Sequence, residues 1–366
     1  RLGAMGLVLE TGSQRVSVVG NIVRDVSGTG IRVGNLDPAP SDADAVEDIV
    51  VRNNYVRETG RELFDNAAIF LGYVRRTIVE HNEIDDAPYT GISLGWGWSL
   101  TPTVARDNRI AQNLVHHVMR RLLDGGGIYT LSTQEGSVLE GNYLHDVMNV
   151  HAGLYFDQGS QHYAARGNIL ASVPNWYLLQ PVVEPHARDI VLEGNFADTT
   201  NAYCCGGLGC CTDPSWGNTI DGTTTFAPGA WPAPAAAIMT AAGLEPAYAD
   251  QRARVLRIEA EDFILGGEGV GHHDLTPGNA GVAATRTAYR EMEGADVYAG
   301  WGPSGDHWLG YTQTGEWTRY LADVRSSGMH TLTFYVGTQS ATDAIAVTID
   351  GAAPIRVPLP DTGSWG

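Results

Sequence analysis

Short apolar runs bounded by turn residues fill the first 200 residues of the chain. One recurrent phrase contains an inner asparagine, found at Asn21, Asn54, Asn82, Asn113, Asn142, Asn168 and Asn195. A second phrase falls between these, as in "GLVLE", "GIRVG", "AIFLG", "GISLG", "GIYTL" and "GLYFD". Each repeat therefore predicts two or three short strands joined by turns.

Repeats of this length and β character predict a solenoid of parallel strands, in which each coil buries apolar side chains against its neighbours. Asparagine at one recurrent position tolerates a left-handed turn and can hydrogen-bond to the next asparagine in the stack. Longer spacings at Asn35–Asp48 and Trp96–Asn108 indicate inserted loops. Insertions on one face of a solenoid usually build its binding surface.

The pattern changes twice after Asn195. Residues 229–254 contain Trp231-Pro232 and an alanine-rich run ending at Gly243, which predict a short helix that caps or straps the solenoid. From Val255 strands alternate with turns, which favours a β-sandwich. We therefore expect an all-β protein with a β-helix at 1–228, a helical strap at 229–254 and a sandwich at 255–366 that lacks its last strands.

The composition limits the classes of partner that we expect for this protein. The formal net charge is -19, the acidic residues are dispersed, and every cation in the Lys+Arg count of 23 is arginine. Nucleic acids and anionic membranes need a basic patch, so neither is expected as a partner. No apolar run reaches the length of a membrane span. The first residues lack signal-peptide features and begin inside a repeat, so we expect an upstream leader and a secreted protein.

The cysteines form one cluster, made of Cys204, Cys205, Cys210 and Cys211. Two short disulfides across a glycine-rich loop would fit an exported protein. A metal cluster is the alternative, although adjacent cysteines are not the usual C-x2-C spacing. His116-His117 and His272-His273 likewise lack a metal-ligand spacing, and we interpret them as surface or core residues.

Five phrases occur together within residues 1–250: "DAPYTGISLGWGW", "DGGGIYTL", "GNYLHDV", "GLYFDQGS" and "AGLEPAY". With these phrases, this part of the chain resembles the right-handed parallel β-helix enzymes of glycoside hydrolase family 141 and its relatives, which include α-L-fucosidase and xylanase activities. The resemblance implies hydrolysis of a xylan- or fucose-containing glycan.

The C-terminal part contains the segments "IEAEDF", "GYTQTGEW", "VTIDG" and "TGSWG". With these segments it resembles a family 6 carbohydrate-binding module, a jelly-roll sandwich. The resemblance implies that Tyr311 and Trp365 clasp a sugar ring. It also implies that Glu259 and Glu261 help to hold a structural calcium ion, which prefers carboxylate oxygens. The alternative is that Tyr311 belongs to the core and the two glutamates merely alternate along a strand.

Sugar hydrolysis normally uses two carboxyl groups that flank the scissile bond. The candidates are Asp124, Glu135 and Asp157, and the resemblance favours Asp124 with Asp157. Aligning "GIYTL" with "GLYFD" places Asp157 beside Leu131 rather than Asp124. The favoured pair therefore requires the chain to bend between Asp124 and Ile128, which the three glycines can supply. Without that bend, Glu135 is the better partner for Asp157.

Other side chains suit a sugar-binding surface. Trp96 and Trp98 offer flat faces to sugar rings. Tyr129 and Tyr155 should stack in adjacent coils, pointing either outward or into the core. The remaining candidates, His151 and Gln158, lie near the two aspartates, and His151 can orient a carboxylate or a hydroxyl.

These observations predict a secreted glycoside hydrolase without a catalytic cofactor, which acts on a polysaccharide or oligosaccharide. One alternative is a non-catalytic sugar-binding or adhesin solenoid in which the aspartates only cap turns. The other is a polysaccharide lyase that uses arginine or tyrosine as its base. Arginine has too high a pKa for an easy base, and the acidic balance suits a neutral sugar better than a polyuronate.

Overall fold

A computed structural model describes residues 3–39, 41–148, 151–180, 183–203, 214–227, 230–249, 251, 258–264, 266–276, 278–279, 290, 293–300, 307–322, 330–341 and 343–363. The chain divides into two compact units, residues 1–252 and 253–366. The four cysteines and Trp365 lie outside the described residues, so the predictions made for them stay predictions.

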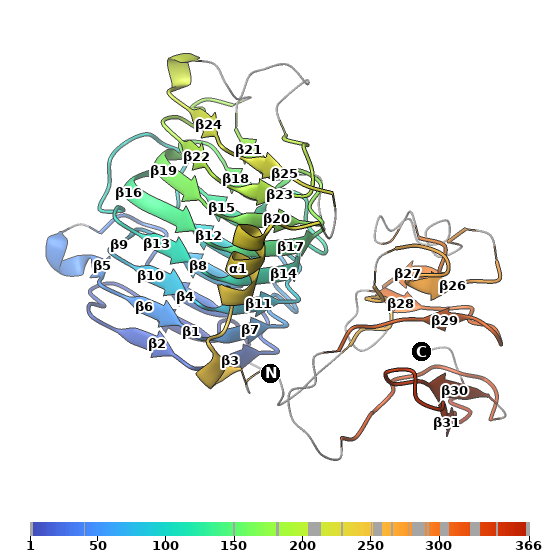
Figure 1. Cartoon of the computed structure of the whole chain (residues 1–366). Coiled ribbons are helices and arrows are strands. Elements are labelled where there is room, and N and C mark those ends of the chain that lie inside the picture. Colours follow the sequence, from blue (N-terminus) through green and yellow to red (C-terminus); the bar gives the residue numbers. More distant parts are fainter. Residues whose placement is uncertain are drawn as a thin grey trace. The chain divides into compact units, whose positions relative to one another are not determined.

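The first unit is a parallel β-helix in which three sheets run along the stack of coils (Figure 1). The 7-stranded sheet contains β1 (Leu7–Leu9), β4 (Ile31–Val33), β8 (Ile69–Leu71), β12 (Ile92–Leu94), β15 (Gly126–Thr130), β18 (Ala152–Phe156) and β21 (Tyr177–Leu179). One 8-stranded sheet contains β2 (Ser17–Val19), β6 (Val50–Arg52), β10 (Ile78–Glu80), β13 (Arg109–Ala111), β16 (Thr133–Glu140), β19 (Gln161–Arg166), β22 (Val191–Glu193) and β24 (Thr219–Asp221). The other contains β3 (Ile22–Arg24), β7 (Tyr55–Arg57), β11 (Glu83–Asp85), β14 (Leu114–Val118), β17 (Tyr143–Val147), β20 (Ile169–Ala171), β23 (Phe196–Ala197) and β25 (Thr224–Thr225). The expected solenoid is confirmed.

Equivalent residues stack from coil to coil, because every neighbouring pair of strands in the three sheets is parallel, and the one register shift lies between Thr133 and Ser137 of β16 where it pairs with β19. Ile92 pairs with Ile128, and Ile128 pairs with Leu154. These three side chains are fully buried in the central core. The residue after each of them points to the other face of the sheet, because side chains alternate along a strand. The core is therefore a set of apolar columns inside the coil.

The recurrent asparagines form a continuous ladder between the two 8-stranded sheets. Each Nδ2 donates to the Oδ1 of the next asparagine at 2.9–3.0 Å, from Asn21 to Asn195. The same Oδ1 also accepts the backbone N–H of the preceding rung, as Asn113 does from Asn82 at 3.0 Å. The predicted asparagine stack is confirmed.

The reason proposed for asparagine at these positions is wrong. The left-handed conformation belongs to the residue before each ladder asparagine, such as Asn53, His81 and Gln112, at φ values of 51–54°. Glycine takes that place in other coils, as at Gly20 and Gly141. The ladder asparagine is therefore selected for the hydrogen bonds of its amide.

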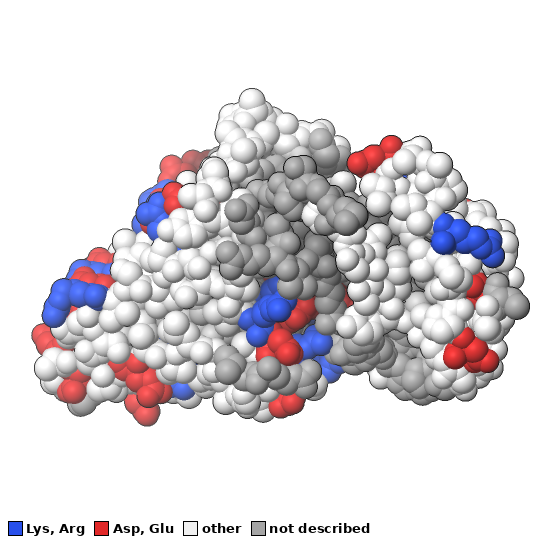
Figure 2. All heavy atoms as spheres, turned by 90° about the horizontal axis from the view of Figure 1, so that it is seen from below, with Lys and Arg blue, Asp and Glu red and all other residues white. Residues whose placement is uncertain are grey.

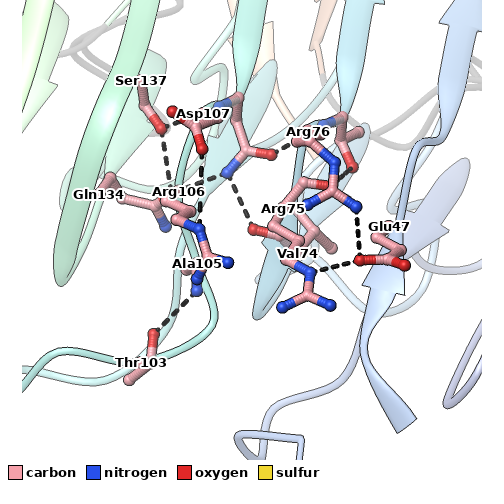
Figure 3. Close-up of polar contacts among 12 residues, drawn as sticks. Glu47, Val74, Arg75, Arg76, Thr103, Ala105, Arg106, Asp107, Gln134 and Ser137 are labelled. Carbon is pink, nitrogen blue, oxygen red and sulfur yellow. Dashed lines mark hydrogen bonds and ion pairs between the residues drawn. The ribbon is translucent and has the colours of Figure 1, made fainter. Parts of the chain in front are cut away.

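Ion pairs join adjacent coils at another corner, next to the pair β5 (Val46–Glu47) and β9 (Val74–Arg75). Arg75 and Arg76 both reach the Glu47 carboxylate of the preceding coil, Arg76 at 2.7 Å (Figure 3). A short helical turn, η1 (Asp42–Asp44), precedes β5 and supplies Asp42 to Arg75 at 2.7 Å. On the face in Figure 2, arginine side chains lie next to acidic ones, so the charges are mixed there.

A strap formed by α1 (Ala233–Ala241) and η5 (Pro246–Tyr248) runs back along the coils (Figure 1). Helix α1 packs against β20. Beyond it, the Gly243 N–H donates to the Gln112 carbonyl at 2.8 Å, and Glu245 accepts from Asn53 at 2.7 Å and Arg52 at 2.6 Å. The strap therefore ties several coils together. Within the described part of the chain, no helix is long and apolar enough to cross a membrane.

The second unit contains three antiparallel strand pairs in its described residues. They are β26 (His272–His273) with β29 (Trp317–Thr318), β27 (Val297–Ala299) with β28 (His307–Leu309), and β30 (Ala344–Val347) with β31 (Ile355–Pro358). Phe263 and Val297 are fully buried within it. One further short helical turn, η4 (Pro214–Trp216), belongs to the first unit.

The ladder predicts that the loss of folding stability on removing one asparagine amide depends on the position of that amide in the ladder. Asn113→Ala leaves the buried Asn82 N–H without its acceptor. It also removes one hydrogen bond each from Asn82 Nδ2, the Val79 carbonyl and the Asn142 Oδ1. We expect the free energy of unfolding to fall by about 3 kcal/mol or more, measured by urea denaturation. The matched control is Asn21→Ala at the exposed end of the ladder, for which we expect a loss under about 1 kcal/mol. Equal losses would mean that the ladder contributes no buried hydrogen bonding to stability.

Candidate active site

Asp157 lies directly after β18 and is held by three side chains. The Tyr129 hydroxyl donates to its Oδ2 at 2.5 Å. Its Oδ1 accepts from the Tyr155 hydroxyl at 3.2 Å and from Gln180 Nε2 at 3.3 Å. The residue is only 5% exposed. The register brings these groups together, because Tyr129 pairs with Tyr155 and the Asp157 N–H donates to the Thr130 carbonyl.

Asp124 lies just before β15, where the chain bends at Leu123 and Asp124. The Tyr89 hydroxyl donates to the Asp124 carbonyl at 2.6 Å, and His151 Nδ1 contacts the Leu123 carbonyl. The Asp124 side chain is exposed, and its Oδ1 accepts from the Tyr155 hydroxyl at 3.3 Å. The backbone contacts therefore fix the bend that directs this carboxylate toward Tyr155.

One hydroxyl thus contacts both candidate carboxylates. The hydrogen bonds of Tyr155 to Asp124 and Asp157 measure 3.3 and 3.2 Å, so the two Oδ1 atoms are no further apart than the sum of these distances. A phenol has a single proton, so it donates to one carboxylate at a time. When one carboxyl group is protonated, it can donate to the phenol oxygen while the phenol donates to the other.

The three glycines after Asp124 do not form the expected bend. The bend precedes them, and Gly126 and Gly127 already belong to β15, in register with β18. None of the three has a positive φ. A Cβ at Gly125 would lie 2.5 Å from Thr90 Oγ1, and one at Gly127 would lie 2.6 Å from a Leu144 methyl carbon. They are needed for close packing, so the predicted bend within the glycines is wrong.

Glu135 lies away from this pair. It belongs to β16 in an 8-stranded sheet, whereas β15 and β18 belong to the 7-stranded sheet. Its side chain is exposed, and its carbonyl accepts from the Asp107 N–H. No hydrogen bond or ion pair joins its carboxylate to Asp124 or Asp157 in the described ranges. The geometry favours Asp124 with Asp157.

Burial raises the pKa of Tyr129 and of Tyr155 well above the ordinary tyrosine value, and the Asp157 carboxylate adds to the shift. Burial, together with the Asp124 charge, raises the pKa of Tyr89 to about 12. All three therefore keep their protons at neutral pH and act as hydrogen-bond donors. A tyrosinate base is disfavoured here.

Aromatic side chains surround the pair. Tyr129 and Tyr155 form an apolar cluster with Leu178 that is separate from the central core, and Trp96 packs against it. Trp98 is 48% exposed and meets Trp96 edge to face at 5.2 Å. The His151 ring stacks on Tyr155 at 5.4 Å. The two tyrosines thus point away from the central core, and Trp98 offers an exposed ring in the inserted loop.

The two glutamines have different roles. Gln158 donates to the Glu184 carbonyl at 3.1 Å, so its amide fixes a loop. Gln180, which sequence reasoning missed, contacts both Tyr155 and Asp157. It lies one coil beyond Asp157, because Leu179 pairs with Phe156. Extending the phrase alignment by one coil would have found it.

In the second unit, Tyr311 is 73% exposed and packs against Tyr298 at 5.5 Å, so it is not a core residue. Glu261 is buried and Glu259 half-buried. Calcium takes 6 to 8 oxygen ligands, and two carboxylates alone do not complete such a site. Among the described residues, the one cluster with metal-ligand spacing lies elsewhere. The calcium site stays a prediction.

Comparisons with known proteins fit this architecture. Residues 3–170 match the family model "Right handed beta helix region", and residues 287–366 match "Carbohydrate binding module (family 6)". A solved structure named "Glycoside hydrolase" is 29% identical and covers 68% of this chain with a TM-score of 0.52. The chain spans only 38% of that protein. No curated protein matches the sequence. The family 141 assignment stays a prediction.

The raised pKa values predict that Tyr129 and Tyr155 keep their protons in the folded chain when the pH is raised. In the folded chain, replacing both Tyr129 and Tyr155 with phenylalanine should leave the phenolate absorbance unchanged up to about pH 11, since neither ionises there. In denaturant, where tyrosines titrate near ~10, the same double variant should lose the absorbance of two phenolates. A loss of two phenolates in the folded state would contradict the burial of these hydroxyls.

Proposed function

We propose that this parallel β-helix with its appended carbohydrate-binding module is a glycoside hydrolase that uses Asp124 and Asp157 as its catalytic carboxyl pair. The observation that carries the proposal is the Tyr155 hydroxyl, which contacts both carboxylates. Hydrolysis of a glycosidic bond needs two such groups on either side of the reacting carbon. The similarity to a protein named "Glycoside hydrolase" supports the same reaction class.

The surroundings of the two carboxylates favour different roles. Asp157 is buried and accepts three side-chain hydrogen bonds, an environment suited to an ionised nucleophile or base. Asp124 is exposed, and its Oδ1 accepts from Tyr155. Its Oδ2 is then available to carry the proton that goes to the leaving oxygen. Asp124 is therefore assigned as the acid.

The separation of the pair favours retention of the anomeric configuration. Retaining enzymes hold their carboxyl groups about 5–5.5 Å apart, whereas inverting enzymes need about 6.5–9.5 Å to admit a water molecule. The sum of 3.3 and 3.2 Å is an upper bound for the two Oδ1 atoms, so their distance lies at or below the short end of the inverting range. In the retaining reaction Asp157 attacks the anomeric carbon while Asp124 protonates the departing oxygen, and water then hydrolyses the ester with Asp124 as base.

The substrate class follows from the aromatic side chains and the charge. The exposed Trp98 ring can stack on the C–H face of a sugar. The net charge of -19 disfavours a polyuronate, so a neutral xylan- or fucose-containing glycan is the better substrate. The module at residues 287–366 would hold the enzyme on that polymer and raise its local concentration. Such polymers lie outside cells, where we place the protein.

The two rival functions make different demands on the site. A binding-only solenoid does not need a buried aspartate that faces a second carboxylate through a shared hydroxyl. A lyase needs a base beside the substrate, and the high pKa of Tyr129 and Tyr155 makes tyrosinate a poor one. Unsaturated products detected by their ultraviolet absorbance would nevertheless establish the lyase.

The roles of the pair can be tested on a panel of xylan- and fucose-containing substrates. Asp124→Asn and Asp157→Asn should each lower the rate of hydrolysis by at least about a hundredfold, because each removes proton transfer or the nucleophile. The matched control is Glu135→Gln, which changes an exposed carboxylate of another sheet and should keep the unmodified rate. Loss of activity in Glu135→Gln with retention in Asp124→Asn would assign the reaction to the alternative pair.

The role of the module is tested separately. Tyr311→Ala should weaken binding to insoluble polysaccharide about tenfold, because it removes an exposed ring that can stack on sugar. Hydrolysis of a soluble oligosaccharide should be unchanged, since the change lies in the second unit. Leu321→Ala, which shortens a side chain 91% exposed in the same unit, is the control for surface changes. Unaltered binding in Tyr311→Ala would remove Tyr311 from the sugar site.

A further inference from the structure

A second cluster of chemically active side chains lies on the sheet that contains β11, β14 and β17. Asp85 belongs to β11, and His116 and His117 belong to β14 in the next coil. The two imidazole Nδ1 atoms are 2.9 Å apart. The Oδ1 atom of Asp85 lies 3.3 Å from His116 Nδ1 and 3.1 Å from His117 Nδ1. Two nitrogens and one oxygen therefore converge on one point.

The other polar atoms of these three residues face separate partners. The Tyr55 hydroxyl donates to Asp85 Oδ2 at 3.3 Å, and Arg57 lies 4.0 Å from the same atom. His116 Nε2 lies 3.5 Å from the buried Glu83 carboxylate.

His117 is arranged in the same way as His116. His117 Nε2 lies 3.9 Å from Asp146 Oδ2, and that carboxylate is itself contacted by His145 Nδ1 at 2.7 Å. Each histidine thus has one nitrogen directed at the common point and the other directed at a carboxylate. Histidines that bind metals show this arrangement, because the outer carboxylate fixes the ring and its tautomer.

We propose that Asp85, His116 and His117 bind one divalent late first-row transition metal ion, with Zn²⁺ as the best fit. Two imidazoles and a carboxylate suit Zn²⁺, whose ligand atoms lie about 2.0–2.2 Å from the ion. In a tetrahedral site such bonds place ligand atoms about 3.3 Å apart, close to the 2.9, 3.1 and 3.3 Å found here. Calcium and magnesium prefer all-oxygen sites, so they fit poorly.

The accessibility of the cluster leaves room for the ion and one further ligand. The side chains of Asp85, His116 and His117 are 15%, 13% and 33% exposed, so the site is held in the sheet yet open to solvent. Three protein ligands leave one tetrahedral position for water.

The site is separate from the carboxyl pair, because β11 and β14 belong to an 8-stranded sheet and β18 belongs to the 7-stranded one. A bound ion would link β11 to β14, which are adjacent strands of consecutive coils. We assign it a stabilising role. It shares no residue with the proposed catalytic machinery, so it does not depend on the proposed function.

The first experiment measures metal content after equilibrium dialysis of the full chain against Zn²⁺ with excess Ca²⁺. We expect the double variant His116→Ala, His117→Ala to bind one Zn²⁺ per chain fewer than the unmodified chain. Glu83→Gln, which leaves the three ligands in place, should weaken binding about tenfold or more. The matched control His162→Ala removes an exposed histidine beside a single carboxylate, Asp189, and should keep full binding.

A second measurement identifies the ligands directly and guards against misfolded variants. Co²⁺ added to the unmodified chain should give the visible absorption of a four- or five-coordinate nitrogen–oxygen site, and Zn²⁺ should displace it. Zn²⁺ should also raise the Tm of the unmodified chain, because it binds only the folded state. The proposal is overturned if the unmodified chain takes up no Zn²⁺, if the double variant binds as much as it does, or if the Co²⁺ spectrum shows only thiolate ligands.

Discussion

The hydrogen-bonded asparagine ladder fixes the register of the coils, and the rest of the solenoid depends on that register. Each Oδ1 accepts two hydrogen bonds from the neighbouring coil, one from a side-chain amide and one from a backbone N–H. A shift by one residue would therefore leave several buried groups without partners. Because the register is fixed, residues that are 23 to 38 positions apart in sequence become neighbours in space, as Leu154 and Tyr177 or Ile31 and Ile69 do. Tyr129 contacts Asp157, and Asp85 contacts His117, through this same constraint.

Much of the architecture could be predicted from sequence because it is periodic. The recurrent asparagines identified the ladder, and aligned phrases placed Tyr129 beside Tyr155. The bend at Leu123 and Asp124 could not be predicted, since it depends on contacts from Tyr89 and His151 in neighbouring coils. The role of Asp85 could not be predicted from the sequence for a related reason. His116 and His117 show no metal-ligand spacing along the chain, and only the strand register places Asp85 beside His116.

The proposed reaction and the proposed metal site illustrate two uses of one scaffold. On the 7-stranded sheet, an outward-facing tyrosine column brings two carboxylates together and covers one of them. On an 8-stranded sheet, adjacent rungs bring two imidazoles and a carboxylate to one point. In both places short parallel strands hold the side chains, and at the carboxyl pair the bend at Leu123 and Asp124 supplies the second carboxylate. Function on such a scaffold is therefore a matter of which side chains occupy neighbouring rungs.

The most direct test is a crystal structure of the chain with a sulfur-linked oligosaccharide that the enzyme cannot hydrolyse. We expect the linking sulfur atom to lie within hydrogen-bond reach of Asp124, with the anomeric carbon facing Asp157 and a sugar ring near Trp98. A sugar bound only to the second unit, or one seated on the β-helix away from both aspartates, would contradict the assignment of Asp124 and Asp157 as the catalytic pair.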